Sequence, residues 1–204
     1  MEEIDLNILI LGDSCAGKTS FLLRYVDNYF HEEQISSVGI DVKEKKINMN
    51  GIDINLEIWD TAGQERFGSI SRNFFRNSDG IIFLYNITNK ESFVNIRNWI
   101  RNVEESKENI KKIIVGNNMD LENKREVSKE RLKNFCDNNN IRGFEVSTKL
   151  GINISECFEF LVKLIIGNKS KDELLETYNK EFNNKNISLD IKKKNKSKFK
   201  KKCI

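Results

Sequence analysis

Near its N-terminus the chain reads Ile8-Leu-Ile-Leu-Gly12-Asp-Ser-Cys-Ala-Gly17-Lys18-Thr19. The apolar run is typical of a buried strand, and it leads directly into the pattern G-x-x-x-x-G-K-S/T and then into a helical pattern. In this context Gly12 and Gly17 let the backbone turn so that successive N–H groups point at phosphates, and Lys18 adds a positive charge. The Thr19 hydroxyl is an oxygen ligand of the kind that Mg²⁺ prefers. The stretch predicts a loop that binds nucleotide phosphates. The alternative is an ordinary glycine-containing turn, and the loop alone does not distinguish adenine from guanine.

The first 167 residues alternate short apolar runs with helical patterns, which is typical of a mostly parallel α/β sheet. The pair Asn50-Gly51 favours a tight hairpin turn between two strands. The pattern predicts a helix over about 18–29, buried strands at 81–85, 113–115 and 144–146, and helices whose apolar stripes begin at Phe93 and Ile154. These stripes indicate helices that pack against a core.

The composition predicts one well-cored domain with an extension. The chain has 204 residues, 38% of them hydrophobic, and no apolar run approaches the ~18 residues that a membrane span needs. The acidic N-terminus is unlike a secretory signal, and the four scattered cysteines form no C-x-x-C pair. We therefore expect a cytoplasmic protein with reduced thiols.

Charge is distributed unevenly along the chain. Residues 191–204 hold eight lysines and no acid, so removing these eight charges from the net charge of +3 leaves −5 for residues 1–190. Residues 168–204 contain too few apolar residues for a core, which predicts a flexible polybasic tail with a short helical turn near Leu174-Leu175. The acidic remainder lacks the basic face of a nucleic-acid binder, so no nucleic acid is expected as a partner.

Three further segments follow proposed strands, at the edge where ligands of open α/β sheets bind. They read Trp59-Asp60-Thr-Ala-Gly63-Gln64-Glu-Arg-Phe67, Asn117-Asn118-Met119-Asp120 and Glu145-Val-Ser147-Thr148-Lys149. A fourth, Phe30-His-Glu-Glu-Gln-Ile-Ser-Ser37-Val-Gly-Ile-Asp41, lies between the phosphate loop and the hairpin. In that order they resemble the D-T-A-G-Q-E-R-F, N-K-x-D, E-x-S-A-K and S-T-I-G-I-D-F motifs of the Rab branch of the small GTPases. The resemblance covers about residues 6–167.

This resemblance implies a P-loop NTPase small G domain over residues 1–167, with a mostly parallel six-stranded sheet, one antiparallel edge strand and helices on both faces. It implies that Thr19, Ser37 and Asp60 bind Mg²⁺, that Gln64 orients the attacking water, and that Gly63 donates its N–H to the terminal phosphate. The Asp120 carboxylate would accept the N1–H and N2–H of guanine, a donor pair that adenine lacks. The implied contacts to GTP or GDP come from the following residues: Asp13, Ser14, Cys15, Ala16, Gly17, Lys18, Thr19, Ser20, Phe30, Ser37, Gly63, Asn117, Asn118, Asp120, Ser147, Thr148 and Lys149.

Four of these positions depart from the family pattern. Asn118 replaces a lysine whose stem covers the base and sugar, which predicts faster nucleotide release. Ser37 replaces a threonine and lacks the methyl group that restrains the rotamer, which predicts a less populated closed arrangement of its segment. Thr148 replaces an alanine and Cys15 replaces a small loop residue, and we expect both to be tolerated.

The partner-binding surface also departs from the family. Three aromatic residues form a recognition patch in Rab proteins, and the matching positions here are Val42, Trp59 and Phe74. Together with Ile40 they form the predicted effector surface, and plain core packing is the alternative for the two aromatic residues. Charged residues at 44 and 46 stand where the family strand is apolar or neutral, so we expect an unusual set of effectors.

The basic run ends in Lys200-Lys-Lys-Cys203-Ile204, which suggests prenylation of Cys203 beside a polybasic patch. The protein would then cycle on to the cytosolic face of an intracellular membrane. Family members usually end in two cysteines or a C-a-a-X box, so this terminus departs from the pattern. The alternative is a lysine-rich solubilising tail, or one that grazes nucleic acid.

The expected function is that of a monomeric switch that binds GTP, hydrolyses it slowly and regulates vesicle traffic. The implied partners are an exchange factor, a GTPase-activating protein, a GDP-dissociation inhibitor or escort protein, and effectors. One alternative is a GTP-dependent adaptor with little or no hydrolysis. Another is a P-loop ATPase or kinase, against which Asp120 argues.

Overall fold

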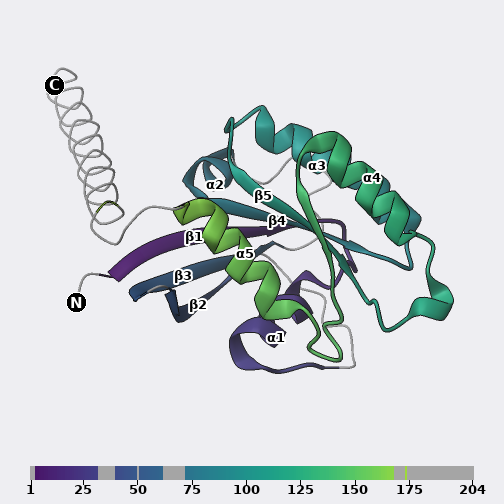
Figure 1. The fold of residues 1–204 in the computed structure, drawn as a ribbon, viewed down its shortest axis with the longest axis horizontal. Coiled ribbons are helices and arrows are strands. Elements are labelled where there is room, and N and C mark those ends of the chain that lie inside the picture. The colour runs from purple at the N-terminus through teal and green to yellow at the C-terminus, as the bar shows by residue number, and fades with distance from the viewer. Residues whose placement is uncertain (1–2, 32–39, 50, 62–71, 168–172, 174–204) are drawn as a thin grey trace, which may run out of the picture.

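The computed structural model describes residues 3–31, 40–49, 51–61, 72–167 and 173, in which one sheet lies between two layers of helices (Figure 1). The strands are β1 (Glu3–Leu11), β2 (Ile40–Met49), β3 (Ile52–Thr61), β4 (Gly80–Asn86), β5 (Lys111–Asn117) and β6 (Arg142–Glu145). Their order in space is β2-β3-β1-β4-β5-β6, with β2 antiparallel to β3 and the other neighbours parallel. The predicted sheet with one antiparallel edge strand is confirmed.

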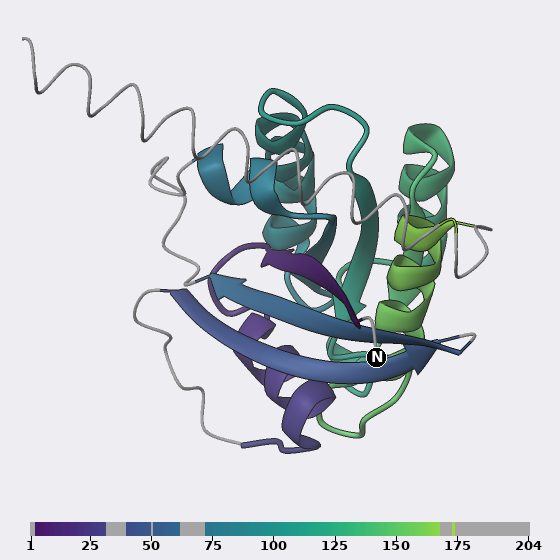
Figure 2. The ribbon, with the colours of Figure 1, turned by 90° about the vertical axis from the view of Figure 1, so that its left-hand side faces the viewer.

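Helices cover both faces of the sheet, as the resemblance implied. They are α1 (Lys18–Asp27), α2 (Arg72–Asn77), α3 (Lys90–Glu104), α4 (Lys129–Asn139) and α5 (Ile154–Ile166), with a 3₁₀ turn at Glu122–Lys124. Buried residues of α1 and α5 pack with one face of the strands, and those of α2, α3 and α4 pack with the other. Figure 2 shows β2 and β3 in the foreground, with α1 on one side of them and α2 on the other.

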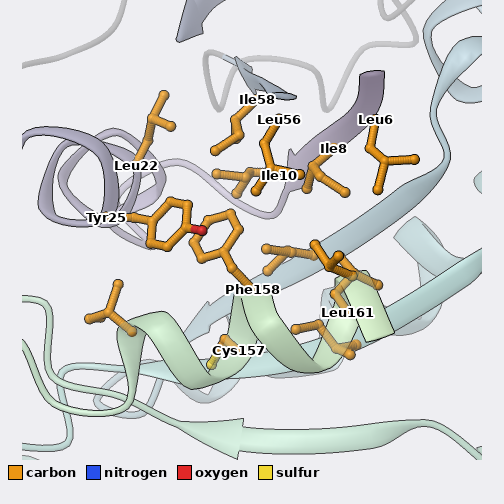
Figure 3. Packing of buried hydrophobic residues seen from close by; sticks show 14 of the residues in the cluster. Leu6, Ile8, Ile10, Leu22, Tyr25, Leu56, Ile58, Cys157, Phe158 and Leu161 are labelled. Carbon is orange, nitrogen blue, oxygen red and sulfur yellow. The ribbon is translucent and has the colours of Figure 1, made fainter. Parts of the chain in front are cut away.

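The central strand β1 supplies side chains to both halves of the core. Its successive residues point to opposite faces of the sheet, so Ile8 and Ile10 join the cluster beneath α1 and α5 while Leu9 and Leu11 join the other. On the first face the Tyr25 ring stacks on Phe158 with centroids 3.7 Å apart, and this pair locks α1 to α5 (Figure 3). Both faces of the parallel strands are therefore buried, as their continuous apolar runs predicted.

Two helices were not predicted from the sequence. Helix α4 begins after Ser128, whose hydroxyl accepts a hydrogen bond from the Arg131 N–H at 3.1 Å. Its inner face carries only Leu132, Phe135 and Cys136, and the remainder is polar. The short helix α2 follows a stretch outside the described residues. In both cases the apolar stripe is too short to stand out from a polar sequence.

Several predictions concern parts of the chain that the structure does not describe. Among them are the tail boundary at 168, the helical turn near Leu174, and Cys203. Within the described residues, no helix is both long enough and apolar enough to span a membrane.

Candidate nucleotide-binding site

The predicted binding segments gather at one edge of the sheet. Strands β1, β3, β5 and β6 are parallel, so their carboxyl ends, at Leu11, Thr61, Asn117 and Glu145, face the same way and lead into the predicted binding segments. Ligands of open α/β sheets bind at this edge. The described parts of the separated motifs therefore lie at one edge of the sheet.

The phosphate loop is packed too tightly for side chains at its two glycines. A Cβ on Gly12 would lie 2.0 Å from the Leu84 carbonyl oxygen, and one on Gly17 would lie 2.4 Å from Asn117 Nδ2. Gly17 also has φ +90°, a conformation that residues with side chains rarely adopt. Lys18 is buried, and its ammonium donates to the carbonyl oxygens of Gly12 at 2.8 Å and Asp13 at 3.2 Å. The loop thus forms a narrow backbone cradle with a positive charge folded along it.

Two predicted Mg²⁺ ligands are in contact. The Thr19 hydroxyl, in the first turn of α1, donates to Oδ2 of Asp60 near the end of β3. Asp60 is fully buried, and a buried carboxylate needs a cation or several hydrogen bonds. A hydroxyl and a carboxylate are the hard oxygen ligands that suit Mg²⁺, so these residues fit that ion. The third predicted ligand, Ser37, lies outside the described residues, as do Gly63 and Gln64.

Asn117 connects the phosphate loop to the two segments predicted to contact the base. Its side chain, only 1% exposed, donates to the Ala16 carbonyl at 3.1 Å. Its Oδ1 accepts from the Asn118 N–H at 2.8 Å, the Thr148 N–H at 3.3 Å and the Thr148 hydroxyl at 2.7 Å. One amide therefore holds three loops together.

The Asp120 carboxylate is fixed by the other segment. The Ser147 hydroxyl donates to Asp120 Oδ1 at 2.6 Å and accepts from the Leu150 N–H at 3.1 Å. The Met119 N–H also donates to the Val146 carbonyl at 3.0 Å. These bonds orient the carboxylate predicted to distinguish guanine from adenine.

The structure describes three of the four departures from the family. The Thr148 hydroxyl is buried and adds a bond to Asn117 that an alanine cannot make, so this residue contributes more than its backbone. Asn118 has φ +67° and Cys15 has φ +63°, the left-handed region that asparagine tolerates better than most residues. Cys15 is exposed, and its Sγ lies 3.7 Å from the Ser14 hydroxyl. Ser20, another predicted nucleotide contact, lies in the first turn of α1.

Arg24 is a positioning residue that sequence reasoning missed. From α1 it donates to the carbonyls of Thr148 and Lys149, each at 2.9 Å, and to Asn28 at the C-cap of its own helix. Its guanidinium also lies 5.7 Å from the centroid of the Phe30 ring. Phe30, predicted to contact the edge of the base, is thereby placed beside the 147–149 segment.

Asp13 is held by α3 rather than turned toward the cradle. The Asn95 amide donates to one carboxylate oxygen at 2.6 Å and the Trp99 indole N–H to the other at 3.1 Å. These contacts span more than 80 residues of sequence, and no local pattern announces them. The side chain of Asp13 thus anchors the phosphate loop to α3, and only its backbone is left to serve a phosphate.

On the outer face of β2 and β3, part of the predicted effector surface can be described. Val42 is 38% exposed and pairs across the strands with Trp59. The Trp59 and Phe74 rings meet edge to face at 5.3 Å, half-buried against the core. The two aromatic residues therefore serve the core and also border the surface. The side chain of Ile40 lies outside the described part.

The next cross-strand pair along this face brings two like charges together. Glu44 stands directly opposite Glu57, and like charges at such a position are unfavourable. Burial, followed by the charges of Glu44 and Asp5, raises the pKa of Glu57 above its ordinary value. The charges on this face therefore repel each other, whereas the polar groups at the loop edge are paired by hydrogen bonds.

Comparison with known proteins agrees with the geometry. The model of the Ras family matches residues 7–167. Ras-related protein Rab-8A of Bos taurus is 41% identical over 194 residues, covering 94% of this chain and 92% of the relative. Ras-related protein Rab-8B of Bos taurus is 40% identical, covering 89% and 84%, and GTP-binding protein yptV2 of Volvox carteri is 41% identical, covering 84% and 82%. The chain therefore belongs to the Ras family and, within it, to the Rab group of small GTPases.

Proposed function

We propose that this chain is a GTP-dependent switch of the Rab type, which hydrolyses GTP slowly and regulates intracellular vesicle traffic. The observation that supports it most directly is the run of contacts from Ala16 through Asn117 and Thr148, and from Ser147 to Asp120. This run joins the phosphate loop to a fixed carboxylate. A site with those two ends suits a guanine nucleotide.

The base end selects guanine through hydrogen bonding. Asp120 accepts two N–H groups from guanine, whereas adenine would leave the carboxylate unpaired, and that loss gives strong discrimination. Ser147 orients the carboxylate, and Arg24 holds Phe30 and the 148–149 backbone beside the base. The amide N–H groups of the 148–149 segment contact the guanine O6.

At the phosphate end, the backbone of residues 13–18 and the Lys18 ammonium bind the β- and γ-phosphates. Thr19, Ser37 and Asp60 hold Mg²⁺, which when bound neutralises charge on the phosphates. Gln64 orients the attacking water, and the Gly63 N–H binds the terminal phosphate. Intrinsic turnover is then roughly 10⁻⁴ s⁻¹, and an activating protein raises it by about 10⁵.

Switching follows from contacts that exist only with GTP. The segments containing Ser37 and Gly63 are tethered by the triphosphate and released after hydrolysis, which changes the surface presented to partners. An exchange factor, an activating protein, a GDP-dissociation inhibitor and effectors complete the cycle. The polybasic tail and a prenylated Cys203 attach the protein to the cytosolic face of a membrane.

A competition assay tests the guanine assignment. GTP and GDP should displace labelled GDP from the purified chain, whereas ATP and XTP should fail even at about 1,000-fold higher concentration. Asp120→Asn should shift the preference toward XTP, and Asp137→Asn, an exposed carboxylate on α4, should leave it unchanged. Equal affinity for ATP and GTP would contradict the proposal.

A further inference from the structure

Helices α3 and α4 lie side by side on one face of the sheet (Figure 1) and enclose a hollow of about 420 Å³. Its aromatic base is the pair Phe93 and Phe135, 4% and 6% exposed, whose rings meet edge to face at 5.3 Å. Val94, 47% exposed, forms an apolar lip. None of the predicted nucleotide-binding residues that the structure describes lines this hollow, so it requires a separate explanation.

Two arginines flank the aromatic pair in a crossed arrangement. Arg97 of α3 places its guanidinium 5.5 Å from the centroid of Phe135 on α4, and Arg131 of α4 lies 5.4 Å from Phe93 on α3. Each stack restricts a long side chain and leaves the N–H groups at the edge of the guanidinium available. Among the described residues, neither guanidinium makes a hydrogen bond or an ion pair. Two oriented cations thus border one hollow without an acceptor from that part of the chain.

The other polar groups of the hollow define its chemistry. Asn134 and Asn138 lie one turn apart on α4 and offer amide donors and acceptors, while Glu130 is the only acid among the described residues of the lining. A guanidinium recognises a carboxylate through two parallel hydrogen bonds. The hollow is larger than one carboxylate needs, and its apolar lip suits a side chain of a longer segment.

We propose that this α3–α4 groove (Phe93, Val94, Arg97, Arg131, Asn134 and Phe135) is a docking site for an acidic segment of a partner protein. Carboxylates of the segment bind Arg97 and Arg131, and a neighbouring apolar side chain packs on Val94 over the aromatic base. The groove is distinct from the switch surface, so this proposal does not rest on guanine binding or hydrolysis.

The test uses the full chain loaded with GDP and a fluorescein-labelled peptide of about ten residues that alternates glutamate and leucine. Saturable binding is expected at about 10–100 μM by fluorescence anisotropy. The double variant Arg97→Gln/Arg131→Gln should weaken it at least about tenfold. The matched variant Arg101→Gln/Lys133→Gln removes two exposed cations from the same helices outside the groove and should change it less than about twofold.

Two further measurements guard against a general charge effect. Val94→Glu places an anion at the lip and should also weaken peptide binding at least about tenfold, with unchanged circular dichroism. A peptide with glutamine in place of glutamate should not bind. Equal weakening by the two double variants, or binding of the glutamine peptide, would overturn the proposal. The proposal would also be overturned if the peptide did not bind while the chain bound vesicles rich in phosphatidylserine through Arg97 and Arg131.

Discussion

At the loop edge of the sheet, buried side chains connect segments that are distant in sequence, whereas the outer face of β2 and β3 sets like charges opposite each other. Asn117 makes four hydrogen bonds with three loops, and Arg24 bonds to two backbone carbonyls of the 148–149 segment. On the outer face, Glu44 opposes Glu57 and Val42 is exposed.

The difference separates two kinds of sequence constraint. A group that is buried and already satisfied is costly to remove, because its partners are left without hydrogen bonds. A surface with a repulsive pair and an exposed apolar residue can instead gain stability when it is altered, and a partner can supply what the chain lacks. The hydrogen bonds at the loop edge hold a ligand site in place. The outer face is not optimised for stability, so a bound partner can stabilise it.

The largest loss is expected from Asn117→Ala. This change removes all four hydrogen bonds of the amide and leaves the buried Ala16 carbonyl and Thr148 hydroxyl unpaired. At about 1–3 kcal/mol for each of these two unsatisfied groups, about 2–6 kcal/mol in total, GDP affinity should fall by roughly 30- to 25,000-fold, measured by stopped-flow release and association. The control is Asn98→Ala, an exposed amide on α3. A loss smaller than about threefold would show that the contacts at Asn117 do not hold the site.

Arg24→Lys tests the second link and should have a smaller effect. Lysine keeps the charge but cannot reach two carbonyls with one planar fork, so the 148–149 segment and Phe30 lose a common support. GDP release should accelerate about tenfold, with about 1–2 kcal/mol lost from the free energy of unfolding. The control is Arg101→Lys: among the described residues the Arg101 side chain bonds only to Asn98, so this change should alter neither quantity.

How much of this could be read from the sequence depends on distance along the chain. The phosphate loop, the six strands and the segments ending in Asp60, Asp120 and Lys149 are local patterns, and the sequence indicates them directly. Arg24 meets Thr148 across 124 residues and Trp99 meets Asp13 across 86, and neither Arg24 nor Trp99 stands out from the other residues of its helix. Only the folded sheet brings them together, which is why these supports were missed.

Thr148 and α4 illustrate the other limits. The threonine in place of the family's alanine is expected to be tolerated, and no local pattern predicts that its buried hydroxyl bonds to Asn117. Helix α4 carries a three-residue apolar face on a polar sequence, below what a hydrophobic period can reveal. The groove beside it was therefore invisible as well.

A moderate effect on release is expected at Asn118. Asn118→Lys restores the stem that covers the base and sugar in the family, so GDP release should slow by about three- to tenfold. The backbone there has φ +67°, where lysine is less favourable than asparagine, so the free energy of unfolding without nucleotide should fall by up to about 1 kcal/mol. Release measured with labelled GDP and thermal melts of the nucleotide-free chain separate the two effects. Unchanged release would show that Asn118 does not cause fast exchange.

The smallest effect, and the only gain in stability, is expected from Glu44→Gln on the outer face. Because the pKa of Glu57 is raised in the folded state, first by burial and then by Glu44, its charged form destabilises the fold. That penalty is absent below the ordinary pKa of about 4, where Glu57 is protonated in both states, and it grows as the pH rises through the folded pKa. Glu44→Gln should therefore raise the free energy of unfolding by about 0.3 kcal/mol at pH 7, a Tm increase of about 1 °C, and by nothing at pH 3.5. Glu108→Gln, an exposed acid away from this strand pair, should show no such pH dependence. A gain that persists at pH 3.5 would mean that repulsion between the two carboxylates is not its source, and the contrast between the loop edge and the outer face would then rest on packing alone.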